Sequence, residues 1–288
     1  MKRRVLVTCG GRLGNQLFIA AFIDRHFPID VEVTSIGFQE MTEGFDWDRT
    51  ARNLDPESWK TRFIFRAARQ LAKLRLIKHI FQTKFEVNFP HGRFRLLDEK
   101  IQTTPGLLPI TLIDRSHLQH RDHVGEVRFH LKDEYKTAAR AFLAQLPEGP
   151  KAFVHVRRGD YKNWTIIGKS PLLPMAYFEE GIRKIQAARP DTIFIYLSDN
   201  IEEVKSTLTS EKLHFFSGKN VYEDFAMMTL CDGGVVSNST LSWWGGYLSN
   251  RTLPVIAPED WVGFPLELEY PVGIIGDWMQ AIPVPKPD

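Results

Sequence analysis

Short apolar runs alternate with longer amphipathic stretches along most of the 288-residue chain. The runs have the length and β-branched composition of buried strands. Segments of helical length separate several of them, for example Pro174–Ala188 and Ile201–Leu208. Such alternation is typical of βαβ units around parallel sheets, so the pattern predicts an α/β protein. The predicted strands are Arg4–Thr8, Val31–Ile36, Ile110–Ile113, Ala152–Val156, Ile193–Leu197, Leu213–Phe216, Gly234–Val236 and Val255–Ala257.

The clearest domain boundary signal lies near the middle of the chain. The length allows one large domain or two small ones. In Leu146-Pro147-Glu148-Gly149-Pro150, prolines and a glycine punctuate the passage from a helical segment to a new strand. We therefore expect two Rossmann-like domains, residues 1–149 and 150–288.

Overall composition excludes several classes of protein. The formal net charge of +2 gives no reason to expect nucleic acid as a partner. The two cysteines, Cys9 and Cys231, form neither a zinc site nor a disulfide framework and fit a reducing compartment. The apolar run after the basic N-terminus is too short for a signal peptide, and no run could span a bilayer. We expect a cytoplasmic protein.

One segment, Trp59 to Phe85, is rich in basic residues and contains no acidic residue. Apolar residues recur in it at helical spacing, which predicts a basic amphipathic helix over 59–85. It could dock on the N-terminal domain through its apolar stripe, or make peripheral contact with an anionic inner membrane. The apolar stripe consists of Phe63, Ala67, Leu71, Leu74, Ile77 and Phe81.

Two adjacent arginines follow the predicted strand that ends at Val156. The carboxyl ends of strands in an open α/β sheet bind ligands, and the donor forks of Arg157 and Arg158 match phosphate oxygens. These residues predict a substrate that carries a diphosphate; the alternative is a structural pair that bridges carboxylates. His155 alternates with Arg157 and should share its face, where it contacts ribose or phosphate or is a satisfied core histidine.

Two further segments combine small residues with a helix start. Gly10-Gly11-Arg12-Leu13-Gly14-Asn15-Gln16 follows the first strand, but it matches neither the phosphate-loop pattern nor the dinucleotide fingerprint. Ser237-Asn238-Ser239-Thr240-Leu241-Ser242 follows an apolar Val-Val pair. Hydroxyls and free N–H groups at a helix start bind anions. A plain tight turn and an N-capping cluster are the competing interpretations.

Three motifs, taken together, resemble those of glycosyltransferase family 11, the α-1,2-fucosyltransferases. They are Gly11–Phe18, His155–Tyr161 and Ser237–Gly245, and they occur in the family's order. Leu241 stands where the family usually has Phe, and Gly246 where it usually has Ala. The resemblance implies a GT-B fold, with two Rossmann-like domains facing across a cleft. Animal members carry an N-terminal membrane anchor, whereas this chain looks like the bacterial type.

The family also implies the reaction: inverting transfer of L-fucose from GDP-β-L-fucose to the 2-OH of a terminal β-galactoside. By this resemblance residues 150–288 bind GDP-fucose, and residues 1–149 form the acceptor side. The implied catalytic residues are Arg157 on the β-phosphate, Asn15 on the leaving group or incoming hydroxyl, and Asp160 as candidate base or as a support for an arginine. The implied donor-binding residues are Gly14, His155, Arg158, Asp224, Ser239, Thr240 and Ser242. Asp224 would accept hydrogen bonds from guanine, unless it only caps a helix.

No cofactor or metal is expected, because arginines can replace a cation on a diphosphate. Asp46-Trp47-Asp48 has the D-x-D form of metal-dependent transferases but lies in a polar stretch. Rival functions are a fucosyltransferase with a peptide or another glycan as acceptor, and a GDP-sugar-binding module without catalysis. The missing fingerprint disfavours an NAD-dependent oxidoreductase. Trp243 and Trp244 could stack on a sugar or lie in the core.

Overall fold

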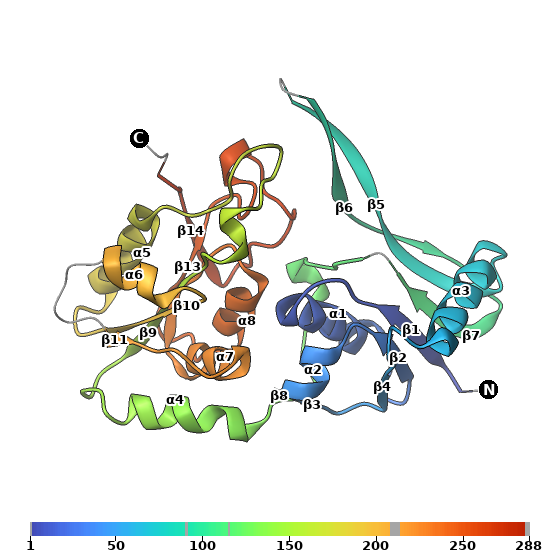
Figure 1. Ribbon diagram of the computed structural model, residues 1–288, viewed down its shortest axis with the longest axis horizontal. Coiled ribbons are helices and arrows are strands. Elements are labelled where there is room, and N and C mark those ends of the chain that lie inside the picture. Colours follow the sequence, from blue (N-terminus) through green and yellow to red (C-terminus); the bar gives the residue numbers. More distant parts are fainter. Residues whose placement is uncertain (1, 90–91, 115, 208–213, 286–288) are drawn as a thin grey trace. The chain divides into compact units, whose positions relative to one another are not determined.

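The computed structural model describes residues 2–285 except 90–91, 115 and 208–213. By its internal contacts the chain divides into two compact units, Met1–His130 and Leu131–Asp288. Each unit is built around a six-stranded sheet flanked by helices (Figure 1).

The first unit has the strand order β4-β2-β1-β7-β5-β6. All neighbours are parallel except β5 and β6, which form a long antiparallel hairpin. Because β1 lies between β2 and β7, the chain leaves β1 in one direction and later returns to its other side. The elements are β1 (Arg4–Thr8), α1 (Leu13–His26), β2 (Glu32–Ile36), α2 (Gln39–Gly44), β3 (Phe45–Trp47), β4 (Ala51–Asn53), α3 (Trp59–Lys73), β5 (Ile77–Phe89), β6 (Gly92–Thr104), β7 (Leu108–Ile113), η1 (Arg121–His123) and β8 (Phe129–Leu131), the last paired with β3.

The second unit has the order β11-β10-β9-β12-β13-β14, with every neighbour parallel. Its central strand is β9, from which β10 and β11 extend to one side and β12 to β14 to the other. The elements are η2 (Asp133–Tyr135), α4 (Lys136–Leu143), β9 (Lys151–Val156), η3 (Asp160–Lys162), α5 (Met175–Ala188), β10 (Ile193–Ser198), α6 (Ile201–Thr207), β11 (His214–Phe215), α7 (Val221–Leu230), β12 (Gly233–Val235), α8 (Thr240–Leu248), β13 (Val255–Pro258), η4 (Phe264–Leu266) and β14 (Met279–Ile282).

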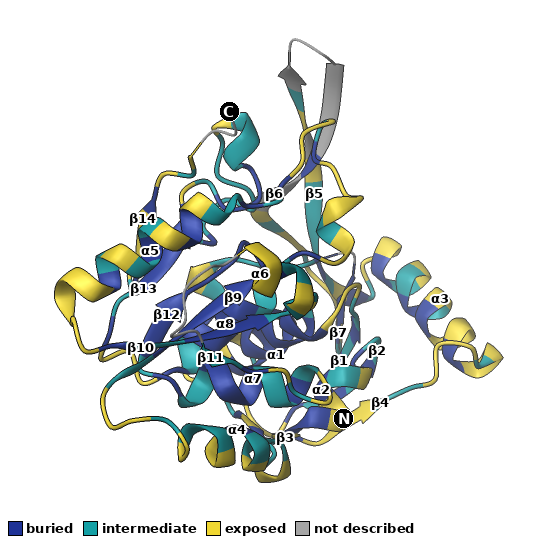
Figure 2. Cartoon of the chain, turned by 60° about the vertical axis from the view of Figure 1, so that its left-hand side comes forward, coloured by how far each residue is buried: buried dark blue, intermediate teal, exposed yellow. Residues whose placement is uncertain are grey.

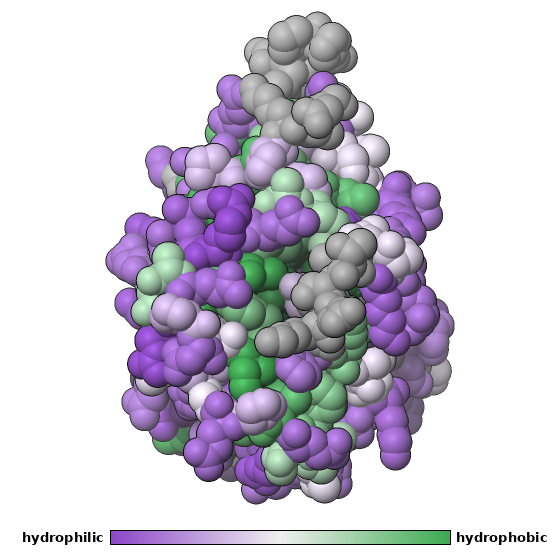
Figure 3. All heavy atoms as spheres, turned by 90° about the vertical axis from the view of Figure 1, so that its left-hand side faces the viewer, coloured by the Kyte–Doolittle hydropathy of each residue, from purple (hydrophilic) through white to green (hydrophobic). Residues whose placement is uncertain are grey.

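The core of the second unit lies on both faces of its sheet. In β9 every residue from Ala152 to Val156 is buried, as a continuous apolar run in a central parallel strand predicts (Figure 2). Helix α5 covers one face with Tyr177, Phe178 and Ile185. On the face that Figure 3 shows, hydrophilic residues surround a band of hydrophobic ones.

Helix α8 is held in the second unit by an aromatic cluster. Trp243 and Trp244 are fully buried, so they are core residues rather than a sugar platform. The ring of Trp243 lies 5.2 Å from those of Tyr247 and Trp278, and its Nε1 donates to the carbonyl of Ile274 at 2.7 Å. At Gly246 an added Cβ would approach Trp278 to 3.3 Å, so the departure from the family's usual alanine accompanies tight packing. These contacts fix the start of α8 relative to the sheet.

The predicted fold class is confirmed: the chain is α/β with two Rossmann-like units, the building blocks of GT-B enzymes. All eight predicted strands overlap observed ones, although Leu208 and Leu213, at the ends of two predicted elements, lie outside the described residues. The units divide after His130, earlier than the predicted boundary at Gly149, because α4 packs against α7 of the second unit.

The predicted helix over 59–85 is wrong in its second half. Helix α3 ends at Lys73, and Arg75 adopts a left-handed φ of 57° before β5 begins at Ile77. The predicted apolar stripe is wrong as well, because the buried face of α3 consists of Thr61, Phe65, Ala68 and Ala72. The sequence suggested a helix throughout because alternating β-branched and aromatic residues in β5 also satisfy a helical spacing over short distances.

Candidate functional site

The strand order of the second unit reverses between β9 and β12. Ligands of open α/β sheets bind beyond the carboxyl ends of the strands at such a switch point, where the following loops diverge. The loop after β9 begins with Arg157, and the loop after β12 consists of Val236 to Ser239. The hydroxyl of Tyr161 donates to the carbonyl of Asn238 at 3.0 Å and so joins the two loops. Two of the three predicted motifs therefore meet here.

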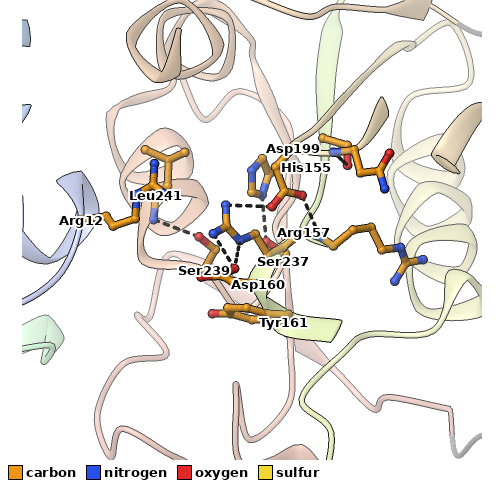
Figure 4. A network of polar contacts seen from close by, with 12 residues as sticks. Arg12, His155, Arg157, Asp160, Tyr161, Asp199, Ser237, Ser239 and Leu241 are labelled. Atoms are coloured by element: carbon orange, nitrogen blue, oxygen red, sulfur yellow. Dashed lines mark hydrogen bonds and ion pairs between the residues drawn. The ribbon is translucent and has the colours of Figure 1, made fainter. Parts of the chain in front are cut away.

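Arg157 lies between two carboxylates at this switch point (Figure 4). Its Nη2 is 2.6 Å from Asp160 Oδ1, and its Nη1 is 3.1 Å from Asp199 Oδ2. The guanidinium also lies over the Tyr161 ring, 5.6 Å from its centroid. The side chain keeps 17% of its surface exposed, so an anion can still approach it. A guanidinium held on several sides is preorganised for such a ligand.

Asp199 is a site residue that the sequence analysis missed. It follows β10 directly, accepts a 2.8 Å hydrogen bond from the backbone N–H of Arg158, and pairs with Arg157. A Cβ at Gly159 would collide with its carboxylate, which explains the glycine after the two arginines. The signal in the sequence was an aspartate at the carboxyl end of a predicted strand, Ile193–Leu197, that neighbours the arginine strand.

Arg158, unlike Arg157, points into the protein. It is 6% exposed, its Nη1 donates to the carbonyl of Leu173 at 2.8 Å, and its Nε lies 3.8 Å from Glu203. Burial lowers the pKa of this guanidinium, and Glu203 and Asp199 oppose that shift. These contacts fit the alternative in which one arginine packs against carboxylates; a donor contact of Arg158 stays a prediction.

His155 and Ser242 belong to a buried chain of hydrogen bonds. His155 Nδ1 is 2.8 Å from Ser237 Oγ, which lies 3.3 Å from Ser242 Oγ. Ser242 Oγ also donates to a carbonyl of the same loop, that of Ser237 or of Ser239. Burial, with a smaller contribution from Arg157, lowers the pKa of His155 to about 3, so its imidazole is neutral near pH 7. These hydrogen bonds hold the loop after β12 against β9.

The start of α8 carries the remaining hydroxyl residues. Ser239 is the N-cap and accepts from the N–H of Leu241 at 3.3 Å, and Thr240 opens the helix. No acidic residue occupies the first turn, which leaves the positive end of the helix dipole open to an anion. Asn238 is 1% exposed; its Nδ2 donates to Pro171, whereas its Oδ1 has no hydrogen-bond partner within the described residues. It is a second residue that the prediction of the site omitted.

Asp224 lies on α7 in the same unit. Its Oδ1 accepts from the N–H of Gly218 at 2.7 Å, in the loop that follows β11. Burial raises the pKa of this carboxyl to about 6; the Gly218 hydrogen bond opposes the shift, and Glu223 and Asp199 add to it. Asp224 is therefore within electrostatic reach of Asp199, the carboxylate that pairs with Arg157. Helix capping does not explain Asp224, because Asn220 caps α7.

The first motif forms the switch point of the first unit, between β1 and β7. Gly11 has φ +103°, and a Cβ there would collide with the side-chain amide of Asn15. Gln16 is buried and joins the turn to α2, because it donates to Gly11 and accepts from the N–H of Met41. Asn15 lies in the first turn of α1, next to Gly14, and its Oδ1 accepts from Gln119 Nε2 at 2.7 Å.

A buried carboxylate joins the two central strands at this first switch point. Asp114 follows β7 directly. Its Oδ1 accepts a 2.6 Å hydrogen bond from Thr8 Oγ1, which lies at the end of β1. Arg69 of α3 contacts both carboxylate oxygens of Asp114, at 2.8 and 3.0 Å. The pair ties α3 to the sheet, and its charges are satisfied internally.

Within the described residues, no group of three or more His, Cys, Asp or Glu side chains is arranged to hold a metal ion. No helix among them combines the length and the apolar character needed to cross a bilayer.

Comparison with known proteins identifies the family. The sequence model of glycosyl transferase family 11 matches residues 115–269, more than half of the chain, and includes both second-unit motifs. The chain therefore belongs to glycosyl transferase family 11, and the family implies a nucleotide-sugar donor and a glycan acceptor.

Three relatives show how the similarity is distributed. The chain is 24% identical to an α-1,2-colitosyltransferase of Escherichia coli, covering 89% of this chain and 92% of that protein. It is 30% identical to the O-antigen biosynthesis glycosyltransferase WbnK of Escherichia coli, over 38% of each chain. It is also 30% identical to human galactoside α-(1,2)-fucosyltransferase 1, over 49% of this chain and 47% of that one. Two of these three alignments thus span less than half of the relative.

Proposed function

We propose that the protein transfers L-fucose, with inversion, from GDP-β-L-fucose to the 2-OH of a terminal β-galactoside. Membership in family 11 and the α-1,2 linkages named for two of its relatives support a transferase that forms α-1,2 linkages. The observation that carries the proposal is Arg157, held between Asp160 and Asp199 at the switch point of the second unit.

Arg157 would stabilise the leaving group. In-line attack on the anomeric carbon breaks the bond to the β-phosphate, so negative charge grows on that phosphate. A preorganised donor at such a position is worth about 3–4 kcal/mol in the transition state. The open start of α8, with Ser239 and Thr240, would bind the same diphosphate through backbone N–H groups and hydroxyls.

The rest of the donor would be read by acidic and amide groups. Asp224, once ionised, can accept both the N1–H and the exocyclic amine of guanine. Asn238 Oδ1, a buried acceptor, suits a hydroxyl of ribose or of the sugar. His155 would support the loop rather than exchange a proton, because its pKa is near 3.

Two further residues, one in each unit, would act in catalysis. Asp160 is the candidate base, and its bond to Arg157 gives it a second role as a support for that arginine. Asn15 of the first unit would orient the leaving group or the incoming hydroxyl. Arg157 would neutralise charge on the diphosphate in place of a metal ion, so we expect the reaction to need no cofactor.

The test measures GDP release from GDP-fucose by the purified protein, in EDTA, with lactose or Gal-β1,3-GalNAc as acceptor. The expected result is release that depends on an acceptor and is lost in Arg157→Ala. Binding of GDP-fucose without release on any galactoside would favour a binding module or another acceptor, such as a peptide. Failure to bind GDP-fucose would refute the donor assignment.

Colitosyl transfer is a second candidate. The relative aligned over 89% of the chain is named an α-1,2-colitosyltransferase, whereas the fucosyltransferase alignment covers 49%. A competition between fucose and colitose donors, each linked to GDP, decides between the two. A larger kcat/KM for the colitose donor would replace the fucosyl assignment and leave the α-1,2 linkage unchanged.

A further inference from the structure

Helix α3 presents two aromatic side chains away from the protein. Its buried residues, among them Thr61 and Phe65, lie on one side. Phe63 lies two residues from each of them, and two residues correspond to about 200° of helical rotation, so it points the opposite way. Trp59, one turn earlier, shares that outer face. Their exposed fractions are 68% for Trp59 and 65% for Phe63.

Helix α3 carries many exposed residues (Figure 2), and the exposed large apolar side chains are concentrated around it. Large apolar side chains that are exposed in the described part of the chain number eight, and six of them belong to α3, to the turns beside its C-terminal end or to the first residue of β7. Leu107 and Leu108 lie there because their N–H groups donate to the carbonyl of Leu76. The six are Trp59, Phe63, Ile64, Leu74, Leu107 and Leu108.

The surroundings of these aromatic residues are basic. Lys60, Arg66 and Lys73 are exposed on the same helix, and the sequence from Trp59 to Phe85 contains no acidic residue. Arg62 is also exposed, but it lies 3.8 Å from Glu57, which precedes the helix. Lys60 Nζ lies 5.9 Å from the centroid of the Trp59 ring. An aromatic ridge flanked by cations is complementary to a layer that is negatively charged at its surface and apolar beneath.

The helix is fixed in this orientation. Four of its residues are buried against the sheet, and Arg69 contacts both oxygens of Asp114. Trp59 and Phe63 therefore cannot turn inward without breaking that pair and exposing Phe65 and Ala68.

We infer that the outer face of α3, defined by Trp59, Lys60, Phe63 and Arg66, docks the protein on a bilayer that contains anionic lipids. The aromatic rings enter the interface while the cations contact lipid phosphates. This surface belongs to the first unit and includes none of the residues assigned to donor binding.

Vesicle flotation tests the inference, with vesicles of phosphatidylcholine alone or of equal parts phosphatidylcholine and phosphatidylglycerol. The full chain should float with the anionic vesicles and not with the neutral ones. Trp59→Ser/Phe63→Ser should weaken binding about tenfold or more. Lys60→Gln/Arg66→Gln should weaken it by about fivefold for each cation removed.

Matched variants separate this surface from general effects. Ile29→Ser removes another exposed apolar side chain, 44% exposed, and should bind like the unchanged protein. Arg140→Gln/Arg183→Gln removes two exposed cations of the second unit and should also have little effect. With brominated lipids, Trp59→Phe should still bind but should lose the lipid-dependent quenching of tryptophan fluorescence.

Three results would overturn the inference: no binding to anionic vesicles, equal binding of the α3 variants and the unchanged protein, or loss of self-association in the serine double variant. The last would mark the face as an interface between two copies. Flotation needs neither donor nor acceptor, so its outcome is independent of the proposed reaction. An unchanged midpoint of thermal unfolding in the serine double variant would show that the variant is folded.

Discussion

The two switch points have the same topology and opposite chemistry. In the first unit a carboxylate, Asp114, is buried between the central strands, and Arg69 of a surface helix neutralises it. In the second unit the cation lies at the switch point itself: Arg157 is partly exposed, and its carboxylate partners are Asp160 of its own loop and Asp199 of the loop after β10. An internally satisfied carboxylate holds strands together, whereas a braced, accessible guanidinium can bind an anion. The difference favours the second unit as the donor side.

The largest effect is expected at Arg157. In Arg157→Ala the switch point keeps its shape and loses its cation, so kcat/KM should fall about 10²–10³-fold. Arg157→Lys should recover only part of this, because a lysine cannot contact two carboxylates and a phosphate in the same geometry. Steady-state GDP release measures both. Activity near that of the unchanged protein in Arg157→Ala would mean that the anion binds elsewhere.

The first unit offers the complementary test at Asn15. If this residue acts on the reacting groups, Asn15→Ala should lower kcat about 10-fold to 10²-fold and leave GDP affinity unchanged. Calorimetric titration with GDP provides the second readout. A loss of GDP affinity equal to that of Arg157→Ala would mean that both units bind the donor, and not the second unit alone.

The two carboxylates beside Arg157 can be separated from one another. Asp199→Asn keeps the shape but weakens the support of Arg157, so kcat/KM should fall about tenfold. Asp160→Asn should cut turnover and spare GDP binding if Asp160 is the base, and should resemble Asp199→Asn if it only supports the arginine. The pH profile of kcat decides: only the loss of a base removes its acidic limb. Normal turnover in Asp160→Asn would exclude it as base.

The pKa of Asp224 predicts a pH dependence of donor binding. Its raised value of about 6 means that the carboxyl is protonated below that pH and ionised above it. Because guanine requires the ionised form, GDP affinity should rise severalfold from pH 5 to pH 7, and Asp224→Asn should abolish the rise. The effect on folding has the opposite sign: the stability contributed by Asp224 is present below the unfolded pKa and lost as pH rises through about 6. Thermal unfolding of the unchanged protein and of Asp224→Asn, each at pH 5 and pH 7, measures this effect on stability.

The smallest expected effect is that of metal removal. With Arg157 and the start of α8 on the diphosphate, EDTA should leave the rate of GDP release unchanged. Loss of activity that added Mn²⁺ restores would show that the arginine does not replace a cation, and it would reopen the role of Asp46 and Asp48.

The strand pattern and the second-unit motifs were readable in the sequence because each depends on local order along the chain. An apolar strand followed by Arg157, or by Ser237 to Ser242, indicates a sheet edge without any knowledge of tertiary contacts. Asp199 and Asn238 were not predicted because their roles depend on tertiary contacts. Asp199 contacts the loop that follows the adjacent strand β9, and Asn238 is notable only for a buried side-chain oxygen without a partner in the described residues. The C-terminal end of α3 was not predicted because the spacing of apolar residues does not distinguish a helix from an alternating strand over a few residues.

The aromatic packing of α8 should also slow the local opening of this helix. A helix locked by Trp243, Tyr247 and Trp278 opens only when the surrounding core opens. Its amide hydrogens should therefore exchange with deuterium as slowly as those of β9, even though its first turn belongs to the proposed donor site. A donor that arrives there meets backbone N–H groups already in place, and its capture need not wait for the helix to form.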